Sequence, residues 1–215
     1  MTNFNEILFI LDRSGSMSGL EGDTIGGFNS MLKKQQQEGT NALVSTFLFD
    51  HESILLHDRL PISDIQPLTE KEYIARGTTA LLDAIGNSIK HIQNIHKYAR
   101  DEDKPNNTMV FITTDGMENA SKIFTLADIK SLINTQTELG WDFVFMGANI
   151  DAIDVAGNIG ISSDRAVNFI NDKFGINASW HAFSEFISCK AVASAIPSNN
   201  NSWRKKVDQD FISRC

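Results

Sequence analysis

Residues 6–12 read EILFILD, an apolar run that ends in the carboxylate of Asp12. Residues 109–115 read MVFITTD, a second run of the same kind that ends in Asp115. Such continuous runs are typical of strands buried on both faces at the centre of a parallel sheet. Ligands of an open parallel sheet lie beyond the carboxyl ends of its strands, so both aspartates are expected at a binding edge.

Strand-like and helix-like segments alternate along the rest of the chain. Further strands are expected at 42–49, 53–56 and 141–146, and helices at 18–38, 81–98, 126–139, 151–158 and 179–195. A capping box of Ser18 and Glu21 is expected to open the first helix. Residues 50–52 form a short polar link, which predicts a hairpin and one antiparallel edge strand. The pattern predicts an α/β fold with a doubly wound, mostly parallel central sheet and helices on both faces.

Length and composition favour a single domain. The chain has 215 residues, of which 41% are hydrophobic, enough for a core of ordinary size. We expect residues 1–196 to form this domain. Residues 197–215, which begin with a polar, asparagine-rich stretch, are expected to form a linker and a short tail.

Charge and composition exclude several classes of partner. The net charge of −8 repels nucleic acids and anionic lipids, and residues 204–206 are the only tight basic cluster in the sequence. No apolar run approaches the roughly 18 residues of a membrane span. The first residues lack the basic start and apolar stretch of a signal peptide, and the two cysteines have no zinc-site spacing. We therefore expect a cytoplasmic protein that binds neither nucleic acid nor membrane.

Oxygen-bearing side chains alternate after the first expected strand. Asp12, Ser14 and Ser16 can point the same way from a gently curved loop, and a threonine, Thr78 or Thr79, precedes the helix expected at 81–98. Two carboxylates neutralise a dication, and hydroxyl groups complete its shell without adding charge. Mg²⁺ and Mn²⁺ take such hard oxygens, whereas Ca²⁺ usually recruits more carboxylates. The sequence predicts a Mg²⁺ or Mn²⁺ site.

These motifs together resemble the metal-ion-dependent adhesion site of von Willebrand factor type A (vWA) domains. The family pattern reads here DRSGS at 12–16, GTT at 77–79 and DG at 115–116, and the resemblance spans about residues 5–161. Residues 14–17 of the first motif read SGSM, which is similar to the motif of intracellular bacterial and phage-type members. The resemblance implies that the metal is held by Asp12, Ser14, Ser16, Thr79 and Asp115. Thr79 is favoured over Thr78 because, like the threonine of the family pattern, it stands two residues before a leucine, here Leu81.

The resemblance also implies a function. In vWA domains the open coordination position of the metal accepts a Glu or Asp carboxylate from a protein partner, and some members work with AAA-type ATPase complexes. It implies a metal-dependent adaptor that is not an enzyme. The alternatives are a metal-dependent hydrolase acting on phosphate esters, with Glu118 as its candidate base, and a scaffold without metal. Asn149 and Asp151 are candidates for the rim that contacts the partner.

Overall fold

A six-stranded sheet in the order β3-β2-β1-β4-β5-β6 forms the centre of the computed structural model, which describes residues 4–192 and 201–214. The strands are β1 (Asn5–Asp12), β2 (Ala42–Phe49), β3 (Ser53–Pro61), β4 (Asn107–Thr114), β5 (Trp141–Gly147) and β6 (Ala166–Asn168). Neighbouring strands run parallel except at the β2–β3 edge, where they are antiparallel. This arrangement confirms the predicted fold class.

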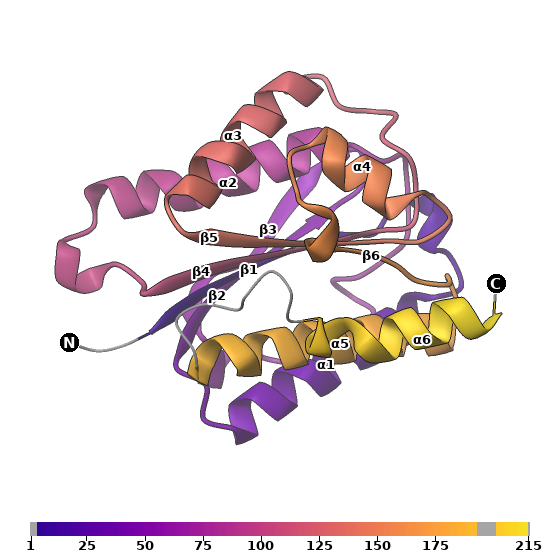
Figure 1. Cartoon of the computed structure of the whole chain (residues 1–215), viewed down its shortest axis with the longest axis horizontal. Helices are drawn as coiled ribbons and strands as arrows, with labels where there is room; N and C mark the ends of the chain where they lie inside the picture. The colour runs from indigo at the N-terminus through magenta and orange to yellow at the C-terminus, as the bar shows by residue number, and fades with distance from the viewer. Residues whose placement is uncertain (1–3, 193–200, 215) are drawn as a thin grey trace.

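Helices cover both faces of the sheet (Figure 1). One face carries α1 (Glu21–Gln37), α5 (Lys173–Val192) and α6 (Lys205–Arg214), and the other carries α2 (Leu81–Tyr98), α3 (Leu126–Glu138) and α4 (Ala152–Asn158). Alternate residues of β1 enter two separate cores. Phe9 packs on the α1 side, whereas Leu8 and Ile10 pack on the α2 side. Burial on both faces is the reason why the run at 6–12 is apolar without interruption.

Several predicted boundaries are wrong. The first helix begins at Glu21 with Leu20 at its N-cap, and no side chain caps it, so the expected capping box with Ser18 does not form. Strand β3 continues to Pro61, and the sequence analysis missed the three-residue strand β6. The last expected helix begins six residues earlier, at Lys173 rather than at 179. Its expected end at 195 lies outside the described residues.

The segment that the structure describes after residue 200 adds to the core. Trp203 and Val207 are buried, and the Trp203 ring meets Phe186 of α5 edge-on with centroids 5.2 Å apart. The expected tail is therefore helical and packed between residues 202 and 214. The domain boundary at 196 stays a prediction. In the described ranges, no helix has the length and apolar character needed to cross a bilayer.

Candidate metal centre

The carboxyl ends of β1 and β4 meet at one edge because the two strands are parallel neighbours. Asp12 is the last residue of β1, and Asp115 directly follows β4. The short 3-10 turn after β1, Gly15–Met17, brings Ser16 back over this edge. Its Oγ lies 3.0 Å from Ser14 Oγ and donates a hydrogen bond of 2.5 Å to Asp115 Oδ1. Four of the predicted residues thus lie in one connected group.

Asp12 is fixed by a dense set of hydrogen bonds. Its side chain is buried, its Oδ1 accepts from the Ser14 amide at 2.6 Å, and its Oδ2 accepts from the Thr114 hydroxyl at 2.5 Å. The buried hydroxyl of Tyr73 donates to the backbone carbonyl of Asp12. This part of the site is rigid before any ligand arrives.

Thr79 supplies the fifth oxygen from a separate loop. Thr79 is buried, whereas Thr78 is exposed. A Cβ built at Gly116 would lie 3.2 Å from Thr79 Oγ1 and 3.3 Å from Ser16 Oγ. Both hydroxyls therefore border the same small space beside Gly116. The structure brings all five predicted residues together and turns Thr78 toward solvent.

Backbone hydrogen bonds tie the Thr79 loop to its neighbours. Asn119 is bound to Thr79 twice, because its Oδ1 accepts from the Thr79 amide at 2.9 Å and its own amide donates to the Thr79 carbonyl at 3.1 Å. Gly77 accepts a hydrogen bond of 3.1 Å from the Gly15 amide. Its φ of +68° and the His51 ring, 2.3 Å from a Cβ built there, leave room for glycine alone.

Asp50, which directly follows β2, connects the loop after β1 to the loop that carries Thr79. Its fully buried carboxylate lies 3.1 Å from Arg13 Nε and accepts a hydrogen bond of 2.8 Å from Arg76 Nε. Its carbonyl also accepts from the Ala80 amide at 2.8 Å. Burial alone would raise the pKa of Asp50, but the hydrogen bond from Arg76 and the charge of Arg13 hold it below its ordinary value.

The site concentrates negative charge in a buried place. Burial raises the pKa of Asp12 to about 6, although hydrogen bonds from Thr114 and Ser14 favour its charged form, and the nearby Asp115 adds repulsion. Burial also raises the pKa of Asp115 against the hydrogen bonds from Ser16 and Asn171. A bound cation would relieve both the desolvation and the repulsion.

The donor set fits a small hard dication. Carboxylate and hydroxyl oxygens are the hard donors that Mg²⁺ and Mn²⁺ take, and the oxygens of Ser14, Ser16 and Asp115 lie within 3.0 and 2.5 Å of one another along a hydrogen-bonded chain. Within the described ranges, no group of three or more His, Cys, Asp or Glu side chains offers an alternative metal site. Asp12, Ser14, Ser16, Thr79 and Asp115 would hold the ion.

Asn171 is a site residue that sequence reasoning missed. It lies between β6 and α5, and its Nδ2 donates a hydrogen bond of 2.8 Å to Asp115 Oδ2. Its Oδ1 is buried and has no hydrogen-bond partner within the described residues. Without β6, which is too short to leave a periodic pattern, nothing in the sequence places this loop at the binding edge.

Glu118, the candidate base, has a structural role. Its Oε2 accepts from the Leu82 amide at 2.9 Å and from the Ser121 hydroxyl at 2.7 Å. Its Oε1 accepts from the amides of Ala120 and Ser121 at 2.9 and 2.7 Å. The hydrogen bond from Leu82 caps the start of α2, and the other three hold the loop at 118–121, so both carboxylate oxygens of Glu118 are engaged within the protein.

The two residues proposed for the rim differ in their structural roles. Asp151 is the N-cap of α4, and its side chain accepts from the amides of Ile153 and Asp154. Asn149 is exposed and has a left-handed backbone with φ of +56°. Asn149 is therefore exposed near this edge, whereas the Asp151 carboxylate is engaged in capping its helix.

Comparisons with known proteins support the fold. No family model and no curated protein sequence matches the chain. A point mutant of the PilB minor pilin from Streptococcus sanguinis is similar, with a TM-score of 0.64 and 10% identity over 91% of this chain and 64% of that chain. The vWF domain of the type V pili tip protein Mfa5 from Porphyromonas gingivalis has a TM-score of 0.64 and 10% identity over 91% of this chain and 99% of that chain.

A third similar structure is the proximal thread matrix protein 1 from the mussel byssus with a zinc-occupied MIDAS (metal-ion-dependent adhesion site) motif. It has a TM-score of 0.53 and 14% identity, and the match covers 88% of this chain and 45% of that chain. The chain thus spans less than two thirds of the pilin and of the mussel protein, and nearly all of the Mfa5 domain. The similarity shows that the chain has the fold of vWA domains.

Proposed function

We propose that this chain is a protein-interaction domain that holds Mg²⁺ or Mn²⁺ and binds an acidic side chain of a partner protein through it. The metal would be held by Asp12, Ser14, Ser16, Thr79 and Asp115. The observation that carries the proposal is the convergence of two carboxylates and three hydroxyls from three separate loops on one edge of the sheet.

The charge of the donor set explains why an acidic side chain is the expected partner. Two carboxylates balance a dication, and the hydroxyls donate electrons without adding charge, so the ion keeps its affinity for an anionic oxygen. Asp12, Ser14 and Asp115 are buried, whereas Gly15 and Ser16 are exposed. A carboxylate from outside would approach on the Ser16 side.

Binding is favoured over catalysis because the expected base, Glu118, is engaged by hydrogen bonds from the protein. Glu118 was the base that a phosphate-ester hydrolase would use, and both of its oxygens accept two hydrogen bonds each. The zinc-occupied MIDAS motif of the mussel protein supports metal binding by this fold. The cytoplasmic location and an AAA-type ATPase partner stay predictions.

The test has two parts. Calorimetry of the metal-free chain with MgCl₂ and MnCl₂ should give one site per chain, and the affinity should drop in Ser14→Ala but not in Ser18→Ala, a serine of the same turn outside the donor set. A tagged chain should then recover a partner in Mg²⁺ and lose it in EDTA. Equal recovery in both buffers, or no measurable metal binding, would reject the proposal.

A further inference from the structure

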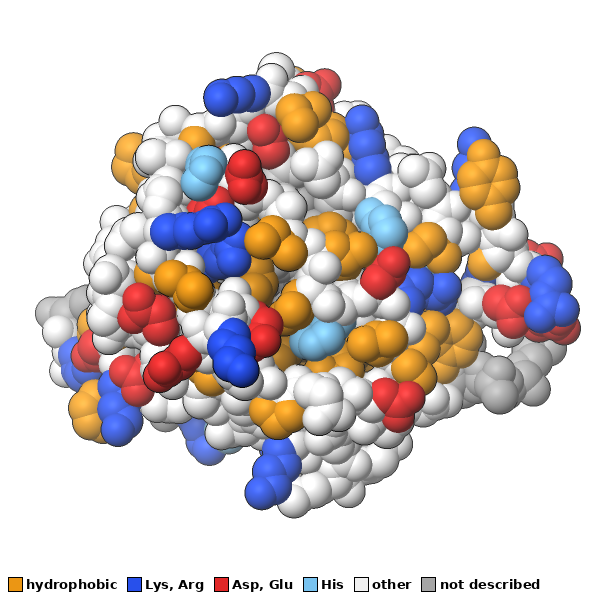
Figure 2. All heavy atoms as spheres, turned by 180° about the vertical axis from the view of Figure 1, so that it is seen from behind, with side chains coloured by type: hydrophobic (Ala, Val, Ile, Leu, Met, Phe, Trp, Pro, Cys, Tyr) orange, Lys and Arg blue, Asp and Glu red, His pale blue; other side chains and the backbone are white. Residues whose placement is uncertain are grey.

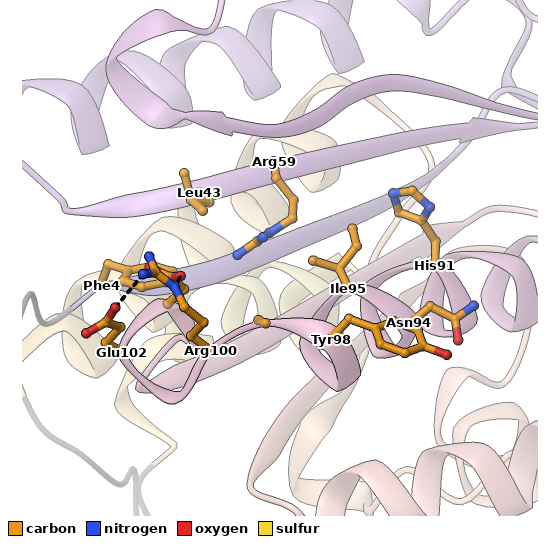
Figure 3. Close-up of a pocket in the computed structure, with 11 residues that line it drawn as sticks. Phe4, Leu43, Arg59, His91, Asn94, Ile95, Tyr98, Arg100 and Glu102 are labelled. Carbon is orange, nitrogen blue, oxygen red and sulfur yellow. Dashed lines mark hydrogen bonds and ion pairs between the residues drawn. The ribbon is translucent and has the colours of Figure 1, made fainter.

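A groove lies between α2 and the β2–β3 side of the sheet (Figure 3). It is lined by Phe4, just before β1, whereas Asp12 of the metal centre is the last residue of that strand. It measures about 940 Å³, within the range of small-molecule sites. One wall is the second half of α2, and the other is formed by β2, β3 and the residue before β1. The lining includes Phe4, Leu43, Arg59, His91, Ile95 and Tyr98.

Arg59 is held rigidly at this groove. It lies within a register irregularity of the β2–β3 pair, between His57 and Leu60, and has a φ of +49°, which is uncommon for a residue with a side chain. Its Nε donates to both carboxylate oxygens of Glu6, at 3.1 and 2.9 Å. Glu6 is fully buried in β1 and also lies 3.3 Å from His96 Nε2. An ion pair with a buried carboxylate thus fixes the orientation of the guanidinium.

The outer nitrogens of Arg59 are left for a ligand. Both hydrogen bonds of its guanidinium to described residues come from Nε, and its side chain is 20% exposed. Figure 3 shows the guanidinium extending from β3 into the groove. The two Nη groups of an arginine form a fork that matches the two oxygens of a carboxylate. This fork is preorganised because Glu6 holds Nε.

The other groups at the groove are apolar or already paired. Phe4, Ile95 and Tyr98 offer apolar surface, and Tyr98 is 79% exposed. Arg100 lies 2.8 Å from Glu102 and 2.7 Å from Asp103, so its guanidinium is paired with two carboxylates and is not available to an anionic ligand. Figure 2 looks at the molecule from behind Figure 1, toward the β3 edge, and shows hydrophobic side chains with histidine and charged side chains among them.

We propose that this groove is a second binding site, which takes a small molecule with a flat apolar body and one carboxylate. The carboxylate binds the Nη fork of Arg59, and the apolar body lies between Tyr98 and the sheet. The site is separate from the metal centre and does not depend on the proposed function.

The test is an NMR titration of the full-length chain in EDTA, so that a metal ion cannot bind the carboxylate. The probes are 2-naphthoate, its uncharged analogue 2-naphthamide, and inorganic phosphate. We expect naphthoate to bind at least tenfold more tightly than the other two, with shifts confined to the α2 and β3 walls. Tyr98→Ser and Arg59→Lys should each weaken naphthoate binding at least fivefold, whereas Arg204→Lys, a matched change in the 3-10 turn before α6, should not.

Equal affinity for naphthoate and naphthamide would overturn the proposal, as would shifts centred on Asp12 and Ser16. Absence of naphthoate binding would overturn it as well. Arg59→Lys keeps a positive charge opposite Glu6, and its urea midpoint checks that it folds. If it does not fold, the exposed Tyr98→Ser variant decides: unchanged affinity in that variant rejects the site.

Discussion

Ser16 Oγ lies 2.5 Å from Asp115 Oδ1, although 99 positions separate the two residues in the sequence. The contact exists because β1 and β4 are parallel neighbours, so the loops that follow them share one edge of the sheet. With Ser14 Oγ 3.0 Å from Ser16 Oγ, three side-chain oxygens from two loops form one hydrogen-bonded chain. The proposed function rests on this convergence.

Removing the Ser16 hydroxyl should weaken metal binding without unfolding the chain. Ser16 is exposed, so Ser16→Ala leaves the core intact. We expect Mg²⁺ affinity to fall at least tenfold, about 1.4 kcal/mol, as measured by calorimetry. Ser18→Ala should bind like the wild type. Equal affinities of Ser16→Ala and the wild type would remove Ser16 from the donor set.

Metal binding should weaken in mild acid. The folded, metal-free chain holds the pKa of Asp12 at about 6, above its ordinary value of 3.8, so a proton on Asp12 stabilises that state in acid and this contribution is lost as the pH rises through 6. A cation must displace that proton below pH 6. We expect Mg²⁺ affinity to be about tenfold lower at about pH 5 than at about pH 7. An affinity that does not change over this range contradicts the role of Asp12.

Asp50 should be important for stability as well as for the site. Asp50→Ala leaves the Arg13 guanidinium, 6% exposed, without its buried partner. Breaking a buried ion pair in this way costs about 3–5 kcal/mol. Urea unfolding should report that loss. Glu52→Ala, at the neighbouring but exposed carboxylate, should stay within about 0.5 kcal/mol of the wild type. Equal losses of stability in the two variants would show that the contacts of Asp50 with Arg13 and Arg76 do not hold their two loops together.

Chelation should leave the fold in place. The two cores on either side of the sheet are built from hydrophobic side chains, so circular dichroism in EDTA should show a folded chain. Mg²⁺ at about 100 times its Kd should raise the melting temperature by roughly 5–10 °C. Complete unfolding in EDTA would mean that the ion, rather than the sheet, supplies the folding energy.

Trp203 should stabilise the whole domain. Its ring is buried against Phe186, so Trp203→Ala should cost about 3–5 kcal/mol in urea unfolding. Ile212→Ala, on the exposed side of α6, is the matched control and should have little effect. A loss near zero for Trp203→Ala would show that α6 is a separate tail.

The sequence predicts the sheet because its strands are buried on both faces. The run that ends in Asp12 is apolar from Ile7 to Leu11, and the run that ends in Asp115 is apolar from Met109 to Ile112. The alternation of such runs with helical segments predicts the parallel centre. Strand β6 was missed because three residues are too few to form a periodic pattern. The capping box at Ser18 was wrong because Ser18 belongs to the turn that returns Ser16 to the site.

Motif spacing in the sequence identifies the side chains proposed as metal ligands, but it does not identify the residues that hold those ligands in place. Asp12, Ser14 and Ser16 alternate within five residues, which is visible in the sequence. Asn171 and Asp50 reach the site only through tertiary structure, since each lies in a segment with no motif of its own. Asparagine and aspartate are ordinary loop residues, so nothing local distinguishes them.

A crystal of the chain grown with MnCl₂ gives the most direct test of metal binding at this edge. The account predicts an anomalous difference peak between Asp12, Ser14, Ser16, Thr79 and Asp115, with an oxygen from outside the chain completing the shell. A map with no peak at this edge, or with the peak at other side chains, would contradict it.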